Sequence, residues 1–322
     1  MKAVVQEKYG SSDVLQIRDI PRPEVGDDEV LVRVAAASVD WRVWHLATGT
    51  PYVMRLAGVG LRAPKVSVPR SDVGGRVEAV GKDVTRFAPG DEVYGTCDGA
   101  YAEYASARED KLAPKPPRLS FEQAAAVPFG GFPSLQGLRD HGHLQPGQKV
   151  LIVGAAGAVG TIAVQLAKAF GGEVTGVCGT SKMDLVRGLG ADNVIDYTRE
   201  DFADGRQRYD LILDIAGNSA VSRLRRALTG KGTLLIIGGE SGRRILGIGR
   251  QIRAHLLSPF VGQKLGTFIA KENATDLLAL NELIEAGKLA PVIDRTFPLS
   301  EAPEALRQLE SGQAPGRLVL VV

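Results

Sequence analysis

The sequence predicts an α/β protein in which a β-rich domain is joined to a doubly wound parallel sheet. Residues 149–160, KVLIVGAAGAVG, form an apolar run that ends in spaced glycines, and an apolar pattern at helical spacing follows over 161–168. From Phe121 onward, strand-like and helix-like segments alternate, as in parallel sheets covered by helices on both faces. Before about residue 124, runs of β-forming residues separated by turn signals dominate the chain.

The elements of the parallel sheet follow one another along the second half of the chain. Strands are expected at 149–153, 173–177, 193–196, 209–214 and 233–237, and helices at 158–170, 181–189 and 219–228. After about residue 270 we expect a helix at 274–286, a strand at 292–297, a helix at 300–311 and a strand at 317–322. Because the last strand lies far from the central unit in the sequence, we expect it to rejoin the sheet of the first domain.

Length and composition are those of a globular protein with two cores. The chain has 322 residues and a net charge of +2, which gives no electrostatic reason to expect nucleic acid or a membrane surface as a partner. No apolar stretch reaches membrane-spanning length, and the N-terminus is typical of a first strand and not of a secretory signal. Cys97 and Cys178 are too few for a disulfide framework, so we expect a cytoplasmic protein.

The glycine turn at 154–160 predicts a dinucleotide-binding site. A strand that runs through such a turn into a helix aims free backbone N–H groups and a positive helix end at a pyrophosphate. Gly157 lets the backbone approach the pyrophosphate, and Gly160 lets the helix pack against the strand. Ala155 fills the first position of the usual glycine pattern. The predicted contacts in this turn are Gly154, Ala156, Gly157, Ala158, Val159 and Gly160.

The end of the second predicted strand favours NADPH over NADH. In an NAD-binding unit, an acidic side chain about 20 residues after the turn accepts hydrogen bonds from the ribose. Gly179 occupies that neighbourhood here. An acid would repel a 2′-phosphate, whereas Ser181 and Lys182 can donate hydrogen bonds to one. Asp184 nearby is a weaker signal in the opposite direction.

Segments along the whole chain carry a resemblance to one family. They are MKAVV at 1–5, GDDEVLVRV at 26–34, DVGGRVEAVG at 72–81, FAPGDEVYG at 87–95 and GAYAEY at 99–104. With the turn at 154–160 they resemble the medium-chain dehydrogenase/reductase superfamily and, within it, the zinc-free quinone oxidoreductase branch. The resemblance implies a discontinuous GroES-like catalytic domain (1–124 and 271–322) and a Rossmann NADP-binding domain (125–270), with the cofactor in the cleft between them. It also implies a homodimer that pairs edge strands near 264–269.

The resemblance adds residues to the cofactor site. It implies that Tyr197 touches the region of the 2′-phosphate and that Tyr52 lines the nicotinamide side of the cleft. Pro315 stands where relatives often carry arginine, which leaves Arg317 as a phosphate contact. Loops that pass the ribose and the nicotinamide in the family match Gly217, Asn218, Ile237, Gly238 and Gly239.

The positions that bind zinc in zinc-dependent relatives carry other residues in this chain. Ala37 stands at the first cysteine position, and Ser71 and Asp72 stand at the His-Glu pair. A serine and an aspartate without a histidine or thiolate do not make the usual zinc shell, and the four-cysteine structural lobe is missing too. We therefore expect no zinc. Alcohol oxidation needs a Lewis acid or strong base, whereas hydride transfer to a quinone or an enone β-carbon needs only hydrogen-bond donors and a proton source.

Tyr52 and Asp40 are the candidate catalytic residues. Tyr52 is suited to donate a hydrogen bond to the substrate oxygen, or alternatively packs against the nicotinamide. Asp40 orients Tyr52 or His45, or fixes a turn through hydrogen bonds to the backbone. The long segment 52–68 is expected to form a lid or a substrate wall. Apolar residues expected to line the pocket are Trp41, Trp44, Met54, Leu56 and Leu61.

The sequence thus predicts a zinc-independent, NADPH-dependent oxidoreductase that reduces quinones or activated alkenes. Its substrate would be a small, apolar, electrophilic molecule. Two alternatives stay open: a non-catalytic NADPH-binding protein, as crystallin-like members of the family are, and an alcohol or carbonyl oxidoreductase.

Overall fold

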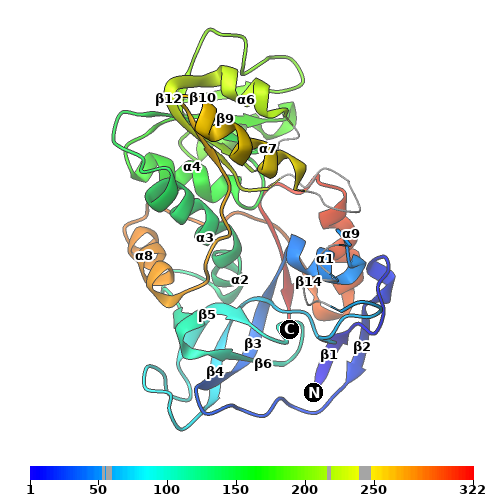
Figure 1. The fold of residues 1–322 in the computed structure, drawn as a ribbon. Helices are drawn as coiled ribbons and strands as arrows, with labels where there is room; N and C mark the ends of the chain where they lie inside the picture. Colours follow the sequence, from blue (N-terminus) through cyan, green and yellow to red (C-terminus); the bar gives the residue numbers. More distant parts are fainter. Residues whose placement is uncertain (53–54, 56–59, 216–218, 239–247) are drawn as a thin grey trace. The chain divides into compact units, whose positions relative to one another are not determined.

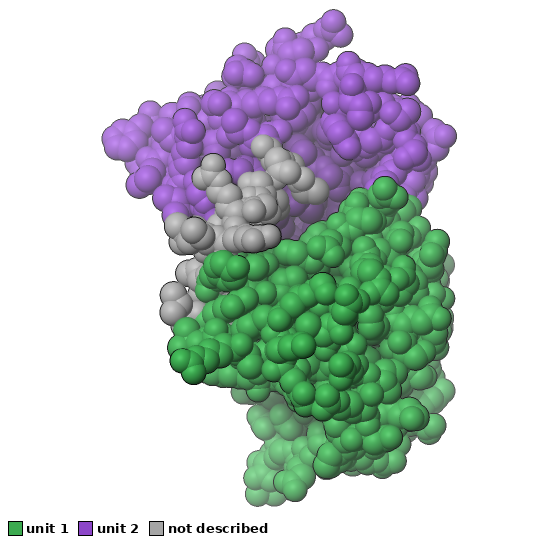
Figure 2. Space-filling model, turned by 90° about the vertical axis from the view of Figure 1, so that its right-hand side faces the viewer, with its two compact units in different colours: residues 1–129, 272–285, 291–322 green, residues 130–271, 286–290 purple. Residues whose placement is uncertain are grey.

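The chain of the computed structural model divides into two units (Figures 1 and 2). Unit 1 comprises Met1–Phe129, Glu272–Glu285 and Pro291–Val322, and unit 2 comprises Gly130–Lys271 and Ala286–Ala290. The structure describes all residues except 53–54, 56–59, 216–218 and 239–247. The sequence places the change of domain after residue 124. The contacts change after Phe129 instead, because Ala125 and Ala126 pack on the sheet of unit 1.

The main sheet of unit 1 is mostly antiparallel. Its strands lie in the order β14-β15-β3-β4-β5-β7, and β6 also pairs with β3. Their bounds are Glu29–Val39 (β3), Ser71–Val80 (β4), Glu92–Cys97 (β5), Tyr104–Arg108 (β6), Leu112–Pro114 (β7), Ile293–Pro298 (β14) and Arg317–Val321 (β15). Val30, Val32 and Val34 alternate along β3, so their side chains share one face and form part of the core. β15 pairs antiparallel with β3, which confirms that the terminal strand rejoins the first sheet.

Smaller elements surround this sheet (Figure 1). An antiparallel pair is formed by β1 (Lys2–Val5) and β2 (Gln16–Asp19). The helices are α1 (Trp41–Thr48), α2 (Phe121–Ala125), α8 (Ala274–Glu285) and α9 (Ala302–Glu310), with short 3-10 turns η1 (Ser12–Val14), η3 (Glu109–Lys111) and η7 (Leu299–Glu301). Asp40 alone separates the end of β3 from the start of α1. The chain therefore turns from strand to helix at a candidate site residue.

The sheet of unit 2 is parallel, with strands in the order β10-β9-β8-β11-β12-β13. The strands are β8 (Lys149–Val153), β9 (Glu173–Cys178), β10 (Asn193–Asp196), β11 (Tyr209–Asp214), β12 (Leu228–Ile236) and β13 (Lys264–Gly266). The helical segments are α3 (Pro128–Gln136), which begins in unit 1, η4 (Gly137–His141), α4 (Gly160–Ala169), η5 (Thr180–Lys182), α5 (Met183–Gly188), α6 (Val221–Ala227), α7 (Gly249–Leu257) and η6 (Ser258–Phe260). The order runs outward from β8 in one direction and from β11 in the other, so the topological switch point lies between these two strands.

The predicted α/β class is confirmed, with several local differences. Helix α1 lies in the part of the chain that the sequence predicts to be β-rich. β12 begins at Leu228 instead of residue 233, because Leu228 already pairs with Tyr209 of β11. A bulge follows, and regular pairing resumes at Thr233. Helix α7 is not predicted by the sequence, because it buries Ala254 while Ile252 and Leu256 stay exposed. Within the described ranges, the helices lack the length and hydropathy that a membrane span requires.

Candidate functional site

The predicted cofactor-binding residues gather at the carboxyl edge of the parallel sheet in unit 2. Gly154 follows β8, Gly179 follows β9, Tyr197 follows β10, and Ile237 follows β12. Ligands of open α/β sheets bind at this edge, next to the switch point. Three further predicted residues, Gly217, Asn218 and Gly239, lie outside the described residues. The structure therefore brings four predicted loops together on the edge where a dinucleotide is expected.

The glycine turn has the backbone geometry that a phosphate cradle requires. Gly154 has a φ of +90°, and its N–H donates to the carbonyl of Val177 at 3.1 Å. A Cβ on Gly160 would lie 2.1 Å from the carbonyl oxygen of Gly154, so only glycine lets α4 start this close to the turn. At Gly157 the nearest atom to such a Cβ is 3.6 Å away. Packing against the described residues therefore does not require glycine at position 157.

The proposed 2′-phosphate end of this edge is formed by two short loops. Ser181 and Lys182 belong to η5, where the N–H of Lys182 donates to the carbonyl of Gly179 at 3.0 Å. The ring of Tyr197 lies 3.7 Å from the place of a Cβ on Gly179, and this ring is exposed. A side chain at position 179 would project toward the tyrosine ring. Because Gly179 has no side chain, the space between the loops after β9 and β10 is not filled from this position.

Ile237 and Gly238 form the loop after β12. Their N–H groups donate to the carbonyl of Asp214 at 3.0 and 3.3 Å. A Cβ on Gly238 would lie 2.2 Å from the carbonyl oxygen of Ile215, so the close approach of these two loops requires glycine.

Arg317 lies in unit 1 and not in the unit of the glycine turn. It begins β15, is buried, and places its guanidinium carbon 4.6 Å from the centre of the Phe129 ring. Burial lowers the pKa of Arg317, against the opposing charges of Asp40 and Asp72. In the part of the chain that the structure describes, its Nε and Nη2 atoms have no hydrogen-bond partner. Its role as a phosphate contact stays a prediction.

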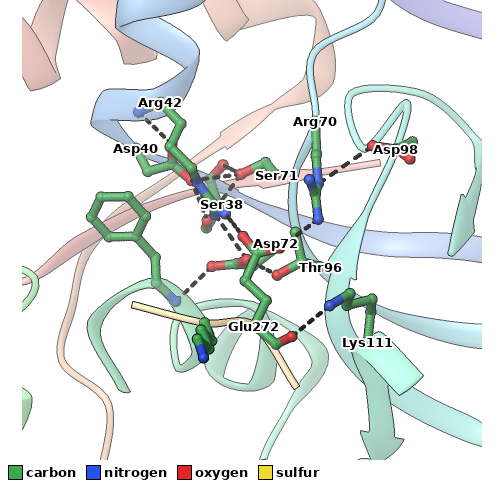
Figure 3. Close-up of polar contacts among 12 residues, drawn as sticks. Ser38, Asp40, Arg42, Arg70, Ser71, Asp72, Thr96, Asp98, Lys111 and Glu272 are labelled. Atoms are coloured by element: carbon green, nitrogen blue, oxygen red, sulfur yellow. Dashed lines mark hydrogen bonds and ion pairs between the residues drawn. The ribbon is translucent and has the colours of Figure 1, made fainter. Parts of the chain in front are cut away.

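A charged cluster in unit 1, which we call the Arg42 cluster, consists of Asp40, Arg42, Asp72 and Glu272 (Figure 3). The Nη2 atom of Arg42 lies 2.9 Å from Oδ2 of Asp40 and 2.8 Å from Oδ1 of Asp72. Its Nη1 atom donates to Oε1 of Glu272 at 2.6 Å. Both aspartate side chains are completely buried, whereas that of Arg42 is 29% exposed. One guanidinium therefore offsets the charge of two buried carboxylates.

Asp40 caps the first turn of α1. Its Oδ1 atom accepts hydrogen bonds from the N–H groups of Arg42 at 2.8 Å and Val43 at 3.2 Å. Its Oδ2 atom accepts from the hydroxyl of Ser71 at 2.9 Å. Burial has the largest single effect on the pKa of Asp40 and raises it, but the charge and hydrogen bond of Arg42, together with the charge of Arg317 and the hydrogen bond from Ser71, outweigh burial and hold the pKa below its usual value. The contacts correspond to the turn-fixing alternative, and a direct chemical role for Asp40 stays a prediction.

Asp72 and Glu272 attach the Arg42 cluster to its surroundings. Asp72 accepts hydrogen bonds from the Thr96 hydroxyl at 2.8 Å and from the Phe129 N–H at 2.7 Å. Glu272 also pairs with Arg70, and its carbonyl oxygen accepts from Nζ of Lys111 at 2.6 Å. Sequence reasoning missed Arg42 and Glu272 as site residues. Arg42 could have been found from the sequence, because it stands only two residues after the candidate Asp40. Glu272 could not, because it comes from a distant part of the chain.

The residues at the expected zinc positions do not fit that metal. Ala37 lies within β3, and the Ser71 hydroxyl donates to the carbonyl of Ser38 at 2.8 Å as well as to Asp40. The guanidinium of Arg42 already stands between the two carboxylates, where a metal would have to replace it. Among the described residues, no group of three or more histidine, cysteine, aspartate or glutamate side chains is arranged to hold a metal.

Tyr52 lies in unit 1, with 42% of its surface exposed. The guanidinium carbon of Arg55 is 4.7 Å from the centre of its ring, and the same guanidinium donates to the carbonyl of Gly49 at 2.8 Å. The described residues provide no hydrogen-bond partner for the Tyr52 hydroxyl, so an orienting bond from Asp40 is not seen there. His45 instead contacts the carbonyl of Thr50, at 2.6 Å from its Nδ1 atom.

The expected apolar pocket wall is described in part. Trp41 and Leu61 are exposed, and the rings of Trp41 and Trp44 are 5.3 Å apart at 71°. Met54 and Leu56 lie outside the described residues, as does part of the segment 52–68. The pocket wall and the lid stay predictions.

Comparison with known proteins finds relatives along the full chain. Residues 26–117 match the family model for the alcohol dehydrogenase GroES-like domain, and residues 189–320 match that for zinc-binding dehydrogenases. A 2-methylene-furan-3-one reductase of Solanum lycopersicum is 32% identical over 336 residues, which are 99% of this chain and 79% of that protein. An NADPH-dependent alkenal/one oxidoreductase of Arabidopsis thaliana is 32% identical over 340 residues, with the same two shares. The structure of a quinone oxidoreductase from Coxiella burnetii superposes with a TM-score of 0.87 at 29% identity, covering 100% of this chain and 99% of that chain.

Proposed function

Because the chain belongs to the quinone oxidoreductase-like branch of the medium-chain dehydrogenase/reductase superfamily, we propose that it uses NADPH to reduce quinones or α,β-unsaturated carbonyls without zinc. The Arg42 cluster is the observation that carries this proposal. It supports a reaction without zinc, because the Arg42 guanidinium lies between Asp40 and Asp72, the latter at one of the positions where the resemblance places zinc ligands. The alkenal/one reductase and the quinone oxidoreductase among the similar proteins support the substrate class.

NADPH would be held by the loops at the carboxyl edge of unit 2. The turn at 154–160 would bind its pyrophosphate, and Ser181, Lys182 and Tyr197 would contact its 2′-phosphate. When bound, NADPH supplies a hydride from C4 of its nicotinamide ring. The open space at Gly157 and the tight contact at Gly160 support this assignment, because one leaves room for the ligand and the other brings the N-terminus of α4 to it.

Tyr52 would hold the proton that the reaction consumes. When a hydride reaches the electrophilic carbon of a quinone or an enone, negative charge develops on the conjugated oxygen. A phenol hydroxyl that has no hydrogen-bond partner among the described residues can donate a hydrogen bond to that oxygen and then transfer its proton. Solvent returns a proton to the phenolate. The enol formed from an enone then tautomerises to the saturated carbonyl compound, and the corresponding adduct of a quinone tautomerises to the hydroquinone.

We also propose that two copies of the chain associate through β13. This strand lies at the end of its sheet, and an unpaired edge is a template for pairing with another chain. Exposed apolar side chains nearby support the contact, since Phe260 is 84% and Ile269 94% exposed. Light scattering on the purified protein tests this. Twice the mass of one chain is expected, and the mass of a single chain would contradict it.

Steady-state kinetics test the proposed reaction. NADPH oxidation is measured with p-benzoquinone and with a medium-chain vinyl ketone, and NADP reduction with a primary alcohol, each with and without a chelator. Turnover with at least one of the first two, unaffected by chelation, is expected. A protein that binds NADPH but turns over none of the three is the non-catalytic alternative. Chelator-sensitive alcohol oxidation would favour the alcohol dehydrogenase alternative.

A further inference from the structure

A buried carboxylate joins the two loops at the proposed 2′-phosphate end of the cofactor site. β10 ends at Asp196, which pairs in register with Cys178, the last residue of β9. The side chain of Asp196 is only 3% exposed. Because the two neighbouring strands end at the same level, the loops that start with Gly179 and Tyr197 leave the sheet side by side.

The oxygens of this carboxylate are already occupied by protein donors. The Thr180 hydroxyl donates to Oδ2. Oδ1 accepts from the N–H of Thr198 at 3.0 Å and from its hydroxyl at 2.7 Å. The hydrogen bond from Thr180, followed by that from the Thr198 hydroxyl, holds the pKa of Asp196 below its usual value. The carboxylate is therefore ionised at neutral pH and hydrogen-bonded to one threonine from each loop.

The backbone of Asp196 also takes part in hydrogen bonds within the loop that follows β10. Its carbonyl oxygen accepts from the N–H groups of Arg199 at 3.0 Å and Glu200 at 2.9 Å. The N–H of Tyr197 donates back to the carbonyl of Cys178 at 3.2 Å. Thr180 stands two residues before Lys182 in η5. A bond that holds Thr180 in place thus also limits where Lys182 can lie.

An acid in this part of a dinucleotide site ordinarily has another role. In NAD-binding units an acidic side chain accepts hydrogen bonds from the ribose hydroxyls, which favours NADH and repels a 2′-phosphate. Here the acid comes from β10 instead of β9, and Thr180 and Thr198 fill three of its roughly four acceptor positions. The Nε atom of Arg199 also lies 3.8 Å from Oδ2. A carboxylate engaged in this way competes poorly for a ribose hydroxyl.

We propose that Asp196 determines the cofactor preference of this protein. Engaged by the two threonines, it fixes the loop that presents Ser181 and Lys182 to a 2′-phosphate. Released from them, the same carboxylate becomes an acceptor for the ribose hydroxyls and favours NADH. This inference rests on the proposed assignment of the cofactor site.

The double variant Thr180→Val/Thr198→Val tests the proposal, because it removes both hydroxyls while nearly keeping side-chain shape. Dissociation constants for NADPH and NADH are measured by nucleotide fluorescence, together with kcat/KM for each. The preference for NADPH over NADH is expected to fall about tenfold or more, through weaker NADPH binding and tighter NADH binding. Adding Asp196→Asn to the double variant is expected to abolish the gain in NADH affinity, because the amide no longer offers a carboxylate to the ribose.

Two controls separate a specific effect from a general loss of structure. Thr229→Val removes a threonine that donates to Asp210 at 3.3 Å, near the opposite ends of the strands in the same sheet, and is expected to leave the preference unchanged. Thr180→Ser keeps a hydroxyl at this position and is therefore expected to retain the preference for NADPH over NADH. If the double variant does not fold, the single variant Thr180→Val tests the proposal instead. Its preference for NADPH over NADH is expected to fall by a smaller factor than in the double variant.

An unchanged preference in the folded valine variants would overturn the proposal, whatever their thermal stability. So would a gain in NADH affinity that persists without the carboxylate. Failure of the proposed function has a different signature. In that case the wild-type protein binds neither nucleotide, or binds NADPH but turns over neither quinone nor enone, and the second outcome still leaves the binding measurements to decide the role of Asp196.

Discussion

The guanidinium of Arg42 bridges the carboxylates of Asp40 and Asp72, with one nitrogen 2.9 Å from the first and 2.8 Å from the second. Asp40 follows the end of β3 and caps α1, while Asp72 lies in β4 and accepts a hydrogen bond from the N–H of Phe129. Through these two carboxylates, the Arg42 side chain therefore links the start of α1, strand β4 and the beginning of α3. Because neither carboxylate reaches solvent, removal of the guanidinium that bridges them is expected to be strongly destabilising.

Replacing Arg42 by methionine is expected to destabilise the protein strongly. The substitution keeps an apolar stem but removes the guanidinium that is hydrogen-bonded to both buried carboxylates, so that only the charge of Arg317 remains near them. Breaking a buried pair from one side costs about 3–5 kcal/mol in the free energy of unfolding. Urea denaturation measures this change. Arg18→Met is the matched control, because Arg18 pairs with Glu7 at an exposed position, where the expected loss is about 0–1 kcal/mol. Equal losses in the two variants would contradict the role of the cluster.

Asp40 should contribute to stability in a pH-dependent way. Its pKa in the folded protein lies below the ordinary value of 3.8, so folding favours the ionised form. The stabilisation is therefore complete above that ordinary value and is lost as the pH falls through the lower pKa of the folded state. The difference in unfolding free energy between wild type and Asp40→Asn should be constant from pH 7 to 5 and shrink in more acidic solution. A difference that grows on acidification would contradict the assignment.

The two glycines of the phosphate turn should respond differently to alanine. Gly160→Ala places a Cβ 2.1 Å from a carbonyl oxygen, so we expect a loss of unfolding free energy of about 1–3 kcal/mol or more. Gly157→Ala meets no atom of the described residues closer than 3.6 Å, so the stability of this variant should be unchanged. Its new methyl group would instead stand in the space of the pyrophosphate, and we expect the KM for NADPH to rise about tenfold or more. Thermal unfolding and steady-state kinetics on both variants test the contrast, which an equal loss of stability would refute.

Tyr52→Phe separates chemistry from packing. If the hydroxyl stabilises charge on the substrate oxygen, kcat should fall by on the order of 10²-fold while the KM for NADPH stays the same. The melting temperature should not change, because the hydroxyl has no partner among the described residues. Unchanged kcat would leave Tyr52 as a residue that only packs against its neighbours.

Local patterns in the sequence were sufficient for the parallel sheet and the phosphate turn. The strand, turn and helix around Gly157 depend on neighbouring residues, so their spacing alone predicts them. The Arg42 cluster depends on Glu272, which tertiary structure brings from a distant segment, and no local pattern points to that contact. The role of Asp196 depends on the register between β9 and β10, which a single sequence does not reveal. Helix α7 was missed because it buries Ala254 while two of its larger apolar residues, Ile252 and Leu256, are exposed, so its sequence lacks a clear apolar stripe.

The catalytic rate of the metal-stripped protein tests the central claim most directly. The protein is treated with a strong chelator and its zinc content is measured. NADPH oxidation is then followed with a quinone and with an α,β-unsaturated ketone, before and after zinc is added back. We predict turnover with at least one acceptor at the rate of the untreated protein and no gain from added zinc. Activity that disappears on chelation and returns with zinc would contradict the account, as would a stripped and an untreated protein that both fail to oxidise NADPH with either acceptor.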